Sequence, residues 1–374
     1  MSGKSARYDV AVVGGGPAGS AVAQRLAQAG GRVVLIERSW LDRPRVGESL
    51  APAVQPLLTE LGVWPEFLGL GPLASYGTRS VWGSDEPEVH SHLVTPWACG
   101  WHVERLALDR LLLESARAAG ADVMLGRAVS RCVPRGGGWA LELKTVARSR
   151  QVERELKVTA GVVIDATGRS ATVAGWLGAR RHVTDRLVSV AVRLEALAGS
   201  TEGFVMVESS PDGWWYTAPV PGDAMMAMLL TDSDLCGHAH LGRMPEWWHR
   251  LQAAPTTFAR VRRGIPVAAP RIYSAISHRL RRSEFSRPWL AVGDAALAVD
   301  PISGSGVVRA LRTAHAAADT VLALGTGSSR LALDAYERDR DIEYTTYLAE
   351  RAQYYALEGR WPEATFWQRR RQRR

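Results

Sequence analysis

The sequence predicts an α/β protein with a Rossmann-type dinucleotide-binding domain, a β-rich second domain and a helical C-terminal segment. Three observations predict this fold class. A strand, a glycine-rich turn, a helix and a second strand follow one another near the N-terminus. Two later buried strands each end in a glycine-containing turn, and strand-like runs fill much of the chain between residues 180 and 270. The length of 374 residues allows two or three folding units.

The first unit has the order that a dinucleotide site requires. Tyr8–Val13 (YDVAVV) predicts a buried parallel strand, Ala18–Ala29 a helix, and Arg32–Ile36 (RVVLI) a second buried strand. Between the first strand and the helix, residues 14–19 read GGGPAG and match G-x-G-x-x-G. This context makes a glycine turn without a ligand improbable.

Each position of the motif has a physical role. Gly14 permits the tight turn, Gly16 lets the backbone approach a pyrophosphate, and Gly19 lets the helix pack against the sheet. The helix N-terminus would then receive the phosphate charge. Glu37 ends the second strand, where an acid accepts hydrogen bonds from ribose hydroxyls.

The remaining elements follow from the same patterns. Two helices are predicted at Arg105–Ala119 and Val308–Leu324, and four strands at Val162–Asp165, Trp289–Val292, Gly203–Glu208 and Met225–Thr231. The last 40 residues are charged and helical in pattern. We therefore expect a discontinuous nucleotide-binding domain (1–75, 100–180 and 271–325), a substrate domain (76–99 and 181–270) and a C-terminal helical segment (326–374).

Composition excludes several classes of protein. The chain has 46% apolar and 22% charged residues, as in an ordinary globular protein. Its three cysteines (Cys99, Cys132 and Cys236) form neither a disulfide framework nor a metal site, and we expect no metal. Because there is no signal-peptide pattern and no apolar run of about 18 residues, we expect a cytoplasmic protein without a membrane span.

The net charge of +8 does not by itself indicate a nucleic-acid partner, because most basic residues are spread along the chain. The exception is the C-terminal run Gln368–Arg374, which we expect to be solvated. His238 and His240 have a spacing that could align them on a strand, but we expect an exposed loop pair and no metal site.

Two further segments decide the cofactor. Val162–Gly168 (VVIDATG) and Trp289–Gly306 (WLAVGDAALAVDPISGSG) resemble fingerprints of the flavoprotein monooxygenase and flavin-dependent halogenase superfamily. The resemblance implies FAD and an architecture like that of p-hydroxybenzoate hydroxylase. It also implies that the Gly-Asp pair reaches the ribityl chain, and that the Asp-Pro turn leads into a helix whose N-terminal amides face the flavin pyrimidine. Such amides stabilise the negative charge of a reduced flavin.

The resemblance extends over nearly the whole chain. Arg45–Leu50 (RVGESL) matches an R-x-G-E-S loop, Trp101–Leu113 matches a helix start whose arginine contacts FAD, and Val129 falls where the family's backbone meets the adenine. The C-terminal stretch from Arg360 to Trp367 also fits the family. The expected FAD contacts are Gly14, Gly16, Pro17, Ala18, Gly19, Glu37, Arg38, Arg45, Glu48, Ser49, Arg105, Val129, Gly293, Asp294, Pro301, Gly304, Ser305, Gly306 and Val307.

Departures from the halogenase pattern indicate a different branch. The segment from Gly213 to Pro219 (GWWYTAP) aligns with G-W-x-W-x-I-P, but Tyr216 and Ala218 replace the second Trp and the Ile. None of the three lysines lies between Ser5 and Leu143, where the family's halogenating lysine belongs, and Ser303 stands in place of the active-site Glu. What remains resembles the flavoproteins that mature tryptophylquinone-containing oxidases by hydroxylating a tryptophan in a partner protein.

We therefore expect an FAD-dependent monooxygenase that hydroxylates an aromatic, indole-like or tryptophan-like substrate through a flavin C4a-hydroperoxide. The substrate is a small molecule or a tryptophan borne by a peptide, protein or carrier. NAD(P)H reduces the flavin directly or through a separate flavin reductase. No catalytic residue is assigned, but Trp214, Tyr216 and His102 are pocket candidates. Trp214 and Tyr216 could equally be core residues of the substrate sheet, and His102 could be structural.

Three other functions stay open. The same features resemble FAD-dependent reductases of isoprenoid double bonds, for which a long aliphatic tunnel would be diagnostic. A flavin-dependent halogenase is less consistent with the missing lysine and glutamate. A non-catalytic basic binding protein that uses FAD structurally is the third alternative.

Overall fold

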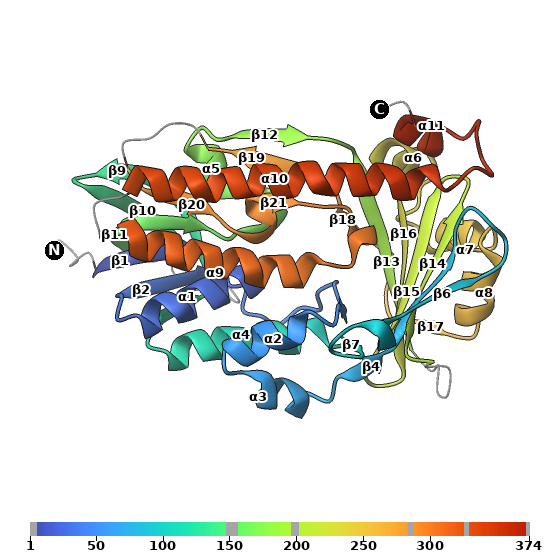
Figure 1. The fold of residues 1–374 in the computed structure, drawn as a ribbon, viewed down its shortest axis with the longest axis horizontal. Coiled ribbons are helices and arrows are strands. Elements are labelled where there is room, and N and C mark those ends of the chain that lie inside the picture. The colour runs from blue at the N-terminus through green and yellow to red at the C-terminus, as the bar shows by residue number, and fades with distance from the viewer. Residues whose placement is uncertain (1–5, 147–155, 196–201, 283–286, 325–328, 372–374) are drawn as a thin grey trace.

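Two large β-sheets lie side by side and are bridged by the C-terminal helices (Figure 1). The computed structural model describes residues 6–146, 156–195, 202–282, 287–324 and 329–371. Within these residues, seven strands form the first sheet in the order β8-β2-β1-β11-β10-β9, with β20 paired to β11. Their bounds are β1 Ala6–Val13, β2 Val33–Glu37, β8 Asp122–Leu125, β9 Arg127–Arg135, β10 Gly138–Thr145, β11 Leu156–Asp165 and β20 Trp289–Ala291.

The first sheet is parallel where the nucleotide unit was predicted. Strand β1 pairs in parallel with β2 and β11, and β20 runs parallel to β11. Its two faces alternate, because successive side chains of a strand point to opposite sides. Val10 and Val12 of β1 pack in a core with α1 (Pro17–Gln28), α4 (Arg105–Ala118) and α9 (Gly306–Leu324).

The opposite face of the first sheet has a separate core. Ala11 and Val13 of β1 pack there with α5 (Thr172–Trp176) and with tyrosines of α10 (Ser329–Ala356). The predicted strand–helix–strand unit is therefore confirmed, with bounds shifted by one or two residues.

The second sheet is largely antiparallel, as predicted. Among the described residues, eight strands form it in the order β17-β13-β16-β15-β14-β5-β6, with β18 paired to β13. Only the β14–β5 pairing of this sheet is parallel. The bounds are β5 Gly77–Val81, β6 Glu88–Ser91, β13 Leu187–Glu195, β14 Phe204–Ser210, β15 Gly213–Val220, β16 Ala224–Asp232, β17 Ile265–Pro266 and β18 Arg271–Ser274.

Two small sheets connect these layers. Strands β12, β19 and β21 form one (Arg180–Val183, His278–Arg281, Leu297–Ala298), and β3, β7 and β4 form the other (Ser49–Leu50, Gly100–His102, Leu73–Ser75). The remaining helices are α2 Val54–Glu60, α3 Trp64–Gly69, α6 Ser233–His238, α7 Met244–Leu251, α8 Pro255–Val261, α11 Thr365–Arg371 and the short 3-10 turns η1 His92–Val94, η2 Gly168–Ser170, η3 Gly293–Ala295 and η4 Pro301–Ser303. No helix of the described ranges is long and apolar enough to cross a bilayer.

Strand pairing suggests slightly different limits for the expected domains. Strand β12, at the start of the expected substrate segment, pairs with β19, whereas β18, just past its expected end, pairs with β13 of the antiparallel sheet. A division that followed strand pairing would therefore move each limit by a few residues. The division into domains itself stays a prediction.

The basic C-terminal run is not the solvated end that we expected. Arg369 and Arg370 lie in α11 and form ion pairs with Asp232 at 2.8 and 2.9 Å. The guanidinium carbon of Arg370 also lies 3.3 Å from the ring centroid of Phe366, and its side chain is only 5% exposed. These ion pairs could not be read from the sequence pattern, because Asp232 belongs to β16, far away in the sequence. Residues 372–374 lie outside the described ranges. His238 and His240 are exposed at the end of α6, as expected.

Candidate functional site

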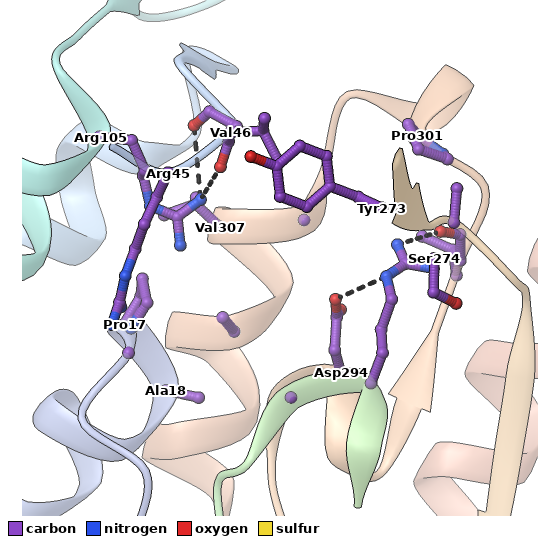
Figure 2. A pocket seen from close by; sticks show the side chains of 18 of the residues that line it. Pro17, Ala18, Arg45, Val46, Arg105, Tyr273, Ser274, Asp294, Pro301 and Val307 are labelled. Atoms are coloured by element: carbon purple, nitrogen blue, oxygen red, sulfur yellow. Dashed lines mark hydrogen bonds and ion pairs between the residues drawn. The ribbon is translucent and has the colours of Figure 1, made fainter. Parts of the chain in front are cut away.

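A single cavity of about 900 Å³ begins at the carboxyl ends of the parallel strands and reaches the face of the antiparallel sheet. Ligand sites of open α/β sheets lie at this edge. Residues just beyond β1, β2, β11 and β20 line the first part, and side chains from β14, β15 and β16 line the second. Figure 2 shows the first part, with Pro17 and Ala18 below Arg45 and with Asp294 opposite.

The glycine motif forms one wall of this cavity as its residue types require. A Cβ at Gly14, which has a φ of +112°, would lie 2.2 Å from the Ala166 carbonyl oxygen. A Cβ at Gly19 would lie 1.8 Å from the Gly14 carbonyl oxygen, so α1 can approach the turn only with glycine there. By contrast, a Cβ at Gly16 would meet no atom of the chain within 4 Å. The space in front of Gly16 is open to the cavity.

The N-terminus of α1 faces the same space. Gly16 is its N-cap and provides no side-chain cap, and Pro17 occupies the first turn. The helix dipole and the amides of the turn are therefore available to an anion. Glu37, at the end of β2, accepts a hydrogen bond from the Gly15 amide at 2.7 Å and holds the turn in place.

A buried aspartate that was not among the expected contacts organises two of the three arginines expected to contact FAD. Asp109 of α4 accepts hydrogen bonds from Arg45 Nη1 at 2.6 Å and from Arg105 Nε at 2.9 Å. Arg105 also donates to the carbonyl oxygens of Val46 and Gly47, at 3.2 and 3.4 Å (Figure 2). The only signal in the sequence was the position of Asp109 one helical turn after Arg105.

A second missed residue, Arg169, holds the expected ribityl-binding aspartate. Arg169 Nε lies 3.2 Å from Asp294 Oδ2, and both residues line the cavity. The same guanidinium donates to the Ile276 and Val299 carbonyl oxygens at 2.6 and 2.9 Å. Arg169 directly follows the VVIDATG segment, so its position beside a fingerprint was the available signal.

The Asp-Pro turn closes the cavity from the side of α9. Asp300 is buried, and its Oδ1 accepts a hydrogen bond from the Ile302 amide at 3.1 Å. Burial raises the pKa of Asp300, and the charge of Arg351 opposes that rise. Gly304 has a φ of +58°, which lets the chain turn into α9. Pro301, Gly304, Gly306 and Val307 all line the cavity.

The far part of the cavity has an aromatic and apolar wall. Trp214 and Tyr216, the two pocket candidates of β15, line it. They are joined by Tyr273 and Tyr354, which were not candidates, and by Val205, Val207, Met228 and Leu230. Trp215 points to the other face of the sheet, where its ring lies 5.2 Å from that of Trp247. Trp214 and Trp215 thus lie on opposite faces of β15, as the two-residue period of a strand requires.

Glu48 and Tyr216 meet inside this wall. Glu48 is buried and Tyr216 is partly buried, and the charge of Glu48 acts on the Tyr216 phenol. Burial raises the pKa of Glu48 and, together with the Glu48 charge, raises that of Tyr216. Glu48 also accepts a hydrogen bond from the Gly47 amide at 3.0 Å.

His102 was a candidate either for the pocket or for a structural role. It is fully buried and is not among the residues that line the cavity. Trp101 of the same strand packs on Trp64 and Phe67, so alternation turns His102 to the opposite side, toward Arg260. Burial lowers the pKa of His102 to about 4, and the charge of Arg260 lowers it further. A structural role is the one that this placement supports.

Most of the expected FAD contacts surround the cavity, and three do not line it. Gly19 packs against the Gly14 turn, and Gly293 packs against Ala18 of α1. The Ser305 hydroxyl lies 2.9 Å from that of Ser303. Val129 lines the cavity from β9, the second strand after α4. The expected contacts in the lining are Gly14, Gly16, Pro17, Ala18, Glu37, Arg38, Arg45, Glu48, Ser49, Arg105, Val129, Asp294, Pro301, Gly304, Gly306 and Val307.

Comparison with known proteins decides the family. A family of FAD-binding domains matches residues 7–347. The chain belongs to this family. The flavoprotein is also 28% identical over 366 residues to LodB of Marinomonas mediterranea, named as an FAD-dependent oxidoreductase. That alignment covers 97% of this chain and 96% of LodB.

Solved structures share the fold of this flavoprotein. The myxobacterial chondrochloren halogenase CndH has a TM-score of 0.88 at 24% identity, over 98% of this chain and 86% of CndH. The peptidyl tryptophan dihydroxylase QhpG has a TM-score of 0.79 at 24% identity, over 98% of this chain and 79% of QhpG. The protein is an FAD-dependent oxidoreductase, and its fold is similar to that of the flavin-dependent halogenase CndH.

The residues present fit that cofactor. The open space in front of Gly16 accepts a pyrophosphate without a steric clash, and the uncapped start of α1 provides its amides. The long shape of the cavity, from β9 and β2 to the start of α9, suits an extended dinucleotide. Within the described residues, no group of three or more His, Cys, Asp or Glu side chains could hold a metal ion.

Proposed function

We propose that the protein is a monooxygenase that hydroxylates an electron-rich aromatic ring, an indole or a tryptophan side chain. One observation carries this proposal: the cofactor-binding end and the aromatic wall belong to the same cavity. An aromatic ring that stacked on Tyr216 would therefore lie in the compartment that the flavin also enters, with Trp214 fully buried in the wall. Bound FAD supplies the oxygen-activating chemistry.

The chain's own residues would position the two reactants. We assign the pyrophosphate to the start of α1, the ribose hydroxyls to Glu37, and the ribityl chain to Asp294, held by Arg169. The amides at the start of α9 would face the flavin pyrimidine and stabilise its negative charge. The apolar and aromatic side chains of the wall, of which Trp214 is fully buried, would keep water away from the reacting ring.

The same cavity argues against the alternatives. Of the lysines, Lys144 and Lys157 lie in described residues and neither lines the cavity, whereas Ser303, in place of the halogenase Glu, does. The wall contains four aromatic rings, and the histidines His90 and His92 also line the cavity, which differs from the aliphatic tunnel of an alkene reductase. Hydroxylation is the reaction that these residues support.

The substrate class follows from the same argument. QhpG is named as acting on a peptidyl tryptophan, so a tryptophan carried by a peptide or protein is the substrate that we propose first. A small indole would use the same wall. We further propose that NAD(P)H reduces the flavin, either directly or through a separate flavin reductase.

Isotopic labelling tests this function. The FAD-loaded protein would be reduced with NADH, with or without a flavin reductase, and mixed with labelled dioxygen, bromide and either indole or a tryptophan-containing peptide. We expect mass spectrometry to find one or more labelled oxygen atoms in the product and no bromine. Brominated product would instead establish a halogenase. Reoxidation of the flavin without any modified product from either substrate would contradict the proposed substrate class.

A further inference from the structure

One buried face of α10 contacts residues that line both parts of the cavity. Tyr347, Arg351 and Tyr355 recur every four residues and so share one side of the helix. Figure 1 shows α10 running from the parallel sheet to the antiparallel sheet. The helix is therefore placed to connect the cofactor end of the cavity with its aromatic wall.

The hydroxyl of Tyr355 bridges two cavity-lining residues. It accepts a hydrogen bond from Trp214 Nε1 at 2.9 Å and donates one to Asp300 Oδ2 at 2.8 Å. All three side chains are buried. Because Trp214 belongs to the aromatic wall and Asp300 starts the turn into α9, one hydroxyl group links the two ends of the site.

The neighbouring residues of α10 hold the same turn. The Asp300 amide donates to the Tyr347 hydroxyl at 3.0 Å, and that hydroxyl lies 2.7 Å from Ser277 Oγ. Arg351 Nη1 is 2.7 Å from Asp185 Oδ2 and donates to Ser277 Oγ at 3.3 Å. The backbone and the carboxylate of Asp300 are thus both fixed by α10. A rotation of Trp214 would have to break or move the hydrogen bond that Tyr355 receives.

We propose that Tyr355 is a positioning residue that couples the aromatic wall to the Asp300 turn, so that a ring bound against this wall changes the surroundings of the flavin. The coupling rests on the proposed placement of substrate and flavin at the two ends of the cavity. Tyr355 itself does not line the cavity, and it acts through Trp214 and Asp300. The interaction energy between two residues of such a hydrogen-bond network is measured with a double-mutant cycle.

The test uses Tyr355→Phe in the full chain. Phenylalanine keeps the ring contacts with Trp82, Phe366 and Trp367 and removes only the hydroxyl. Tyr336→Phe is the matched control, because Tyr336 is also a buried tyrosine of α10, and its hydroxyl donates to the Ala291 carbonyl oxygen at 2.7 Å. Three quantities would be measured for each protein: FAD affinity, the flavin absorbance change on adding indole, and the melting temperature.

We expect Tyr355→Phe to weaken FAD binding several-fold and to abolish most of the indole-induced absorbance change. Tyr336→Phe should change the melting temperature by a similar amount but leave the FAD affinity and the indole-induced absorbance change unaltered. Trp214→Phe, which removes the indole N–H, should also weaken FAD binding, and the double variant should bind FAD no more weakly than Tyr355→Phe alone.

Several results would overturn the coupling. Unchanged FAD affinity in Tyr355→Phe would do so, as would equal losses in Tyr355→Phe and Tyr336→Phe, or additive losses in the double variant. Absence of an absorbance change in the unmodified protein would count against the proposed substrate placement instead, and the FAD affinities would then decide the coupling by themselves.

Discussion

Asp109 and Arg45 form a short ion pair across the cofactor end of the cavity, with Arg45 Nη1 2.6 Å from Asp109 Oδ2. The Asp109 side chain is completely buried, whereas the Arg45 side chain is 29% exposed and lines the cavity. Since the other oxygen of Asp109 holds Arg105, one buried charge orients two cations toward a site that would bind a dianionic cofactor. The opposite charges also offset the cost of burying the carboxylate.

Asp109→Asn tests this arrangement. We expect it to weaken FAD binding and to lower the free energy of unfolding by about 3 kcal/mol, because it removes the buried carboxylate that Arg45 and Arg105 share and leaves Arg45 only its longer ion pair with Glu37, at 3.5 Å. Calorimetric titration with FAD and urea unfolding would measure the two effects. The control is Glu114→Gln on the same helix, where an exposed ion pair with Arg117 should contribute less than about 1 kcal/mol. Equal effects of the two variants would contradict the role of Asp109.

A substitution in the glycine motif can separate an effect on FAD affinity from an effect on the free energy of unfolding. Gly16→Ala adds a Cβ that meets no atom of the chain within 4 Å, so the unfolding free energy of the apoprotein should hardly change. FAD affinity should fall at least tenfold, because the methyl group would occupy the space assigned to the pyrophosphate. Gly69→Ala, on α3 and equally free of contacts, should change neither quantity. Undiminished FAD binding by Gly16→Ala would place the pyrophosphate elsewhere.

The two neighbouring tryptophans of β15 should behave differently. Trp214→Phe should raise the KM of an aromatic substrate about fivefold, because the fully buried Trp214 ring supports the wall and its replacement costs roughly 1 kcal/mol of ring contact with Trp82. Trp215→Phe changes the opposite face of the sheet, against Trp247, and should reduce stability without changing KM. Steady-state kinetics and thermal unfolding of both variants check this. A larger KM effect from Trp215→Phe would refute the assigned wall.

Two buried histidines make stability depend on pH. Burial lowers the pKa of both His102 and His278 to about 4 in the folded protein, against an unfolded value of 6.5. The unfolded chain therefore binds more protons between these values, and stability falls as the pH drops through this interval. Each histidine should contribute roughly 2 kcal/mol of destabilisation between about pH 7 and about pH 5.

Urea unfolding at the two pH values would measure this effect. His102→Gln should lose part of the pH dependence, and the exposed His249→Gln should retain all of it. If His102→Gln keeps the full dependence, the titration of His102 does not contribute to acid destabilisation.

Several features of the site followed from local sequence alone. The positions of Gly14, Gly16 and Glu37 around the cavity were predictable because a strand, a tight turn and a helix are specified by neighbouring residues. The opposite orientations of Trp214 and Trp215 followed from the period of a strand. The expectation of solvated C-terminal arginines was wrong because it depends on a partner from another element, Asp232 beside Arg370. For His102, local sequence left a pocket role and a structural role open, since its surroundings include Arg260 from another element.

The sequence by itself determined the nucleotide-binding unit, the family and the chemistry of the residues around the cofactor, because these depend on short motifs whose backbone geometry is local. Only the tertiary structure decided that Asp109 joins Arg45 to Arg105, that Arg169 holds Asp294, and that the hydroxyl of Tyr355 lies between Trp214 and Asp300. Such contacts join elements distant in sequence. No periodicity or spacing encodes them, since they arise from how two sheets and a crossing helix pack.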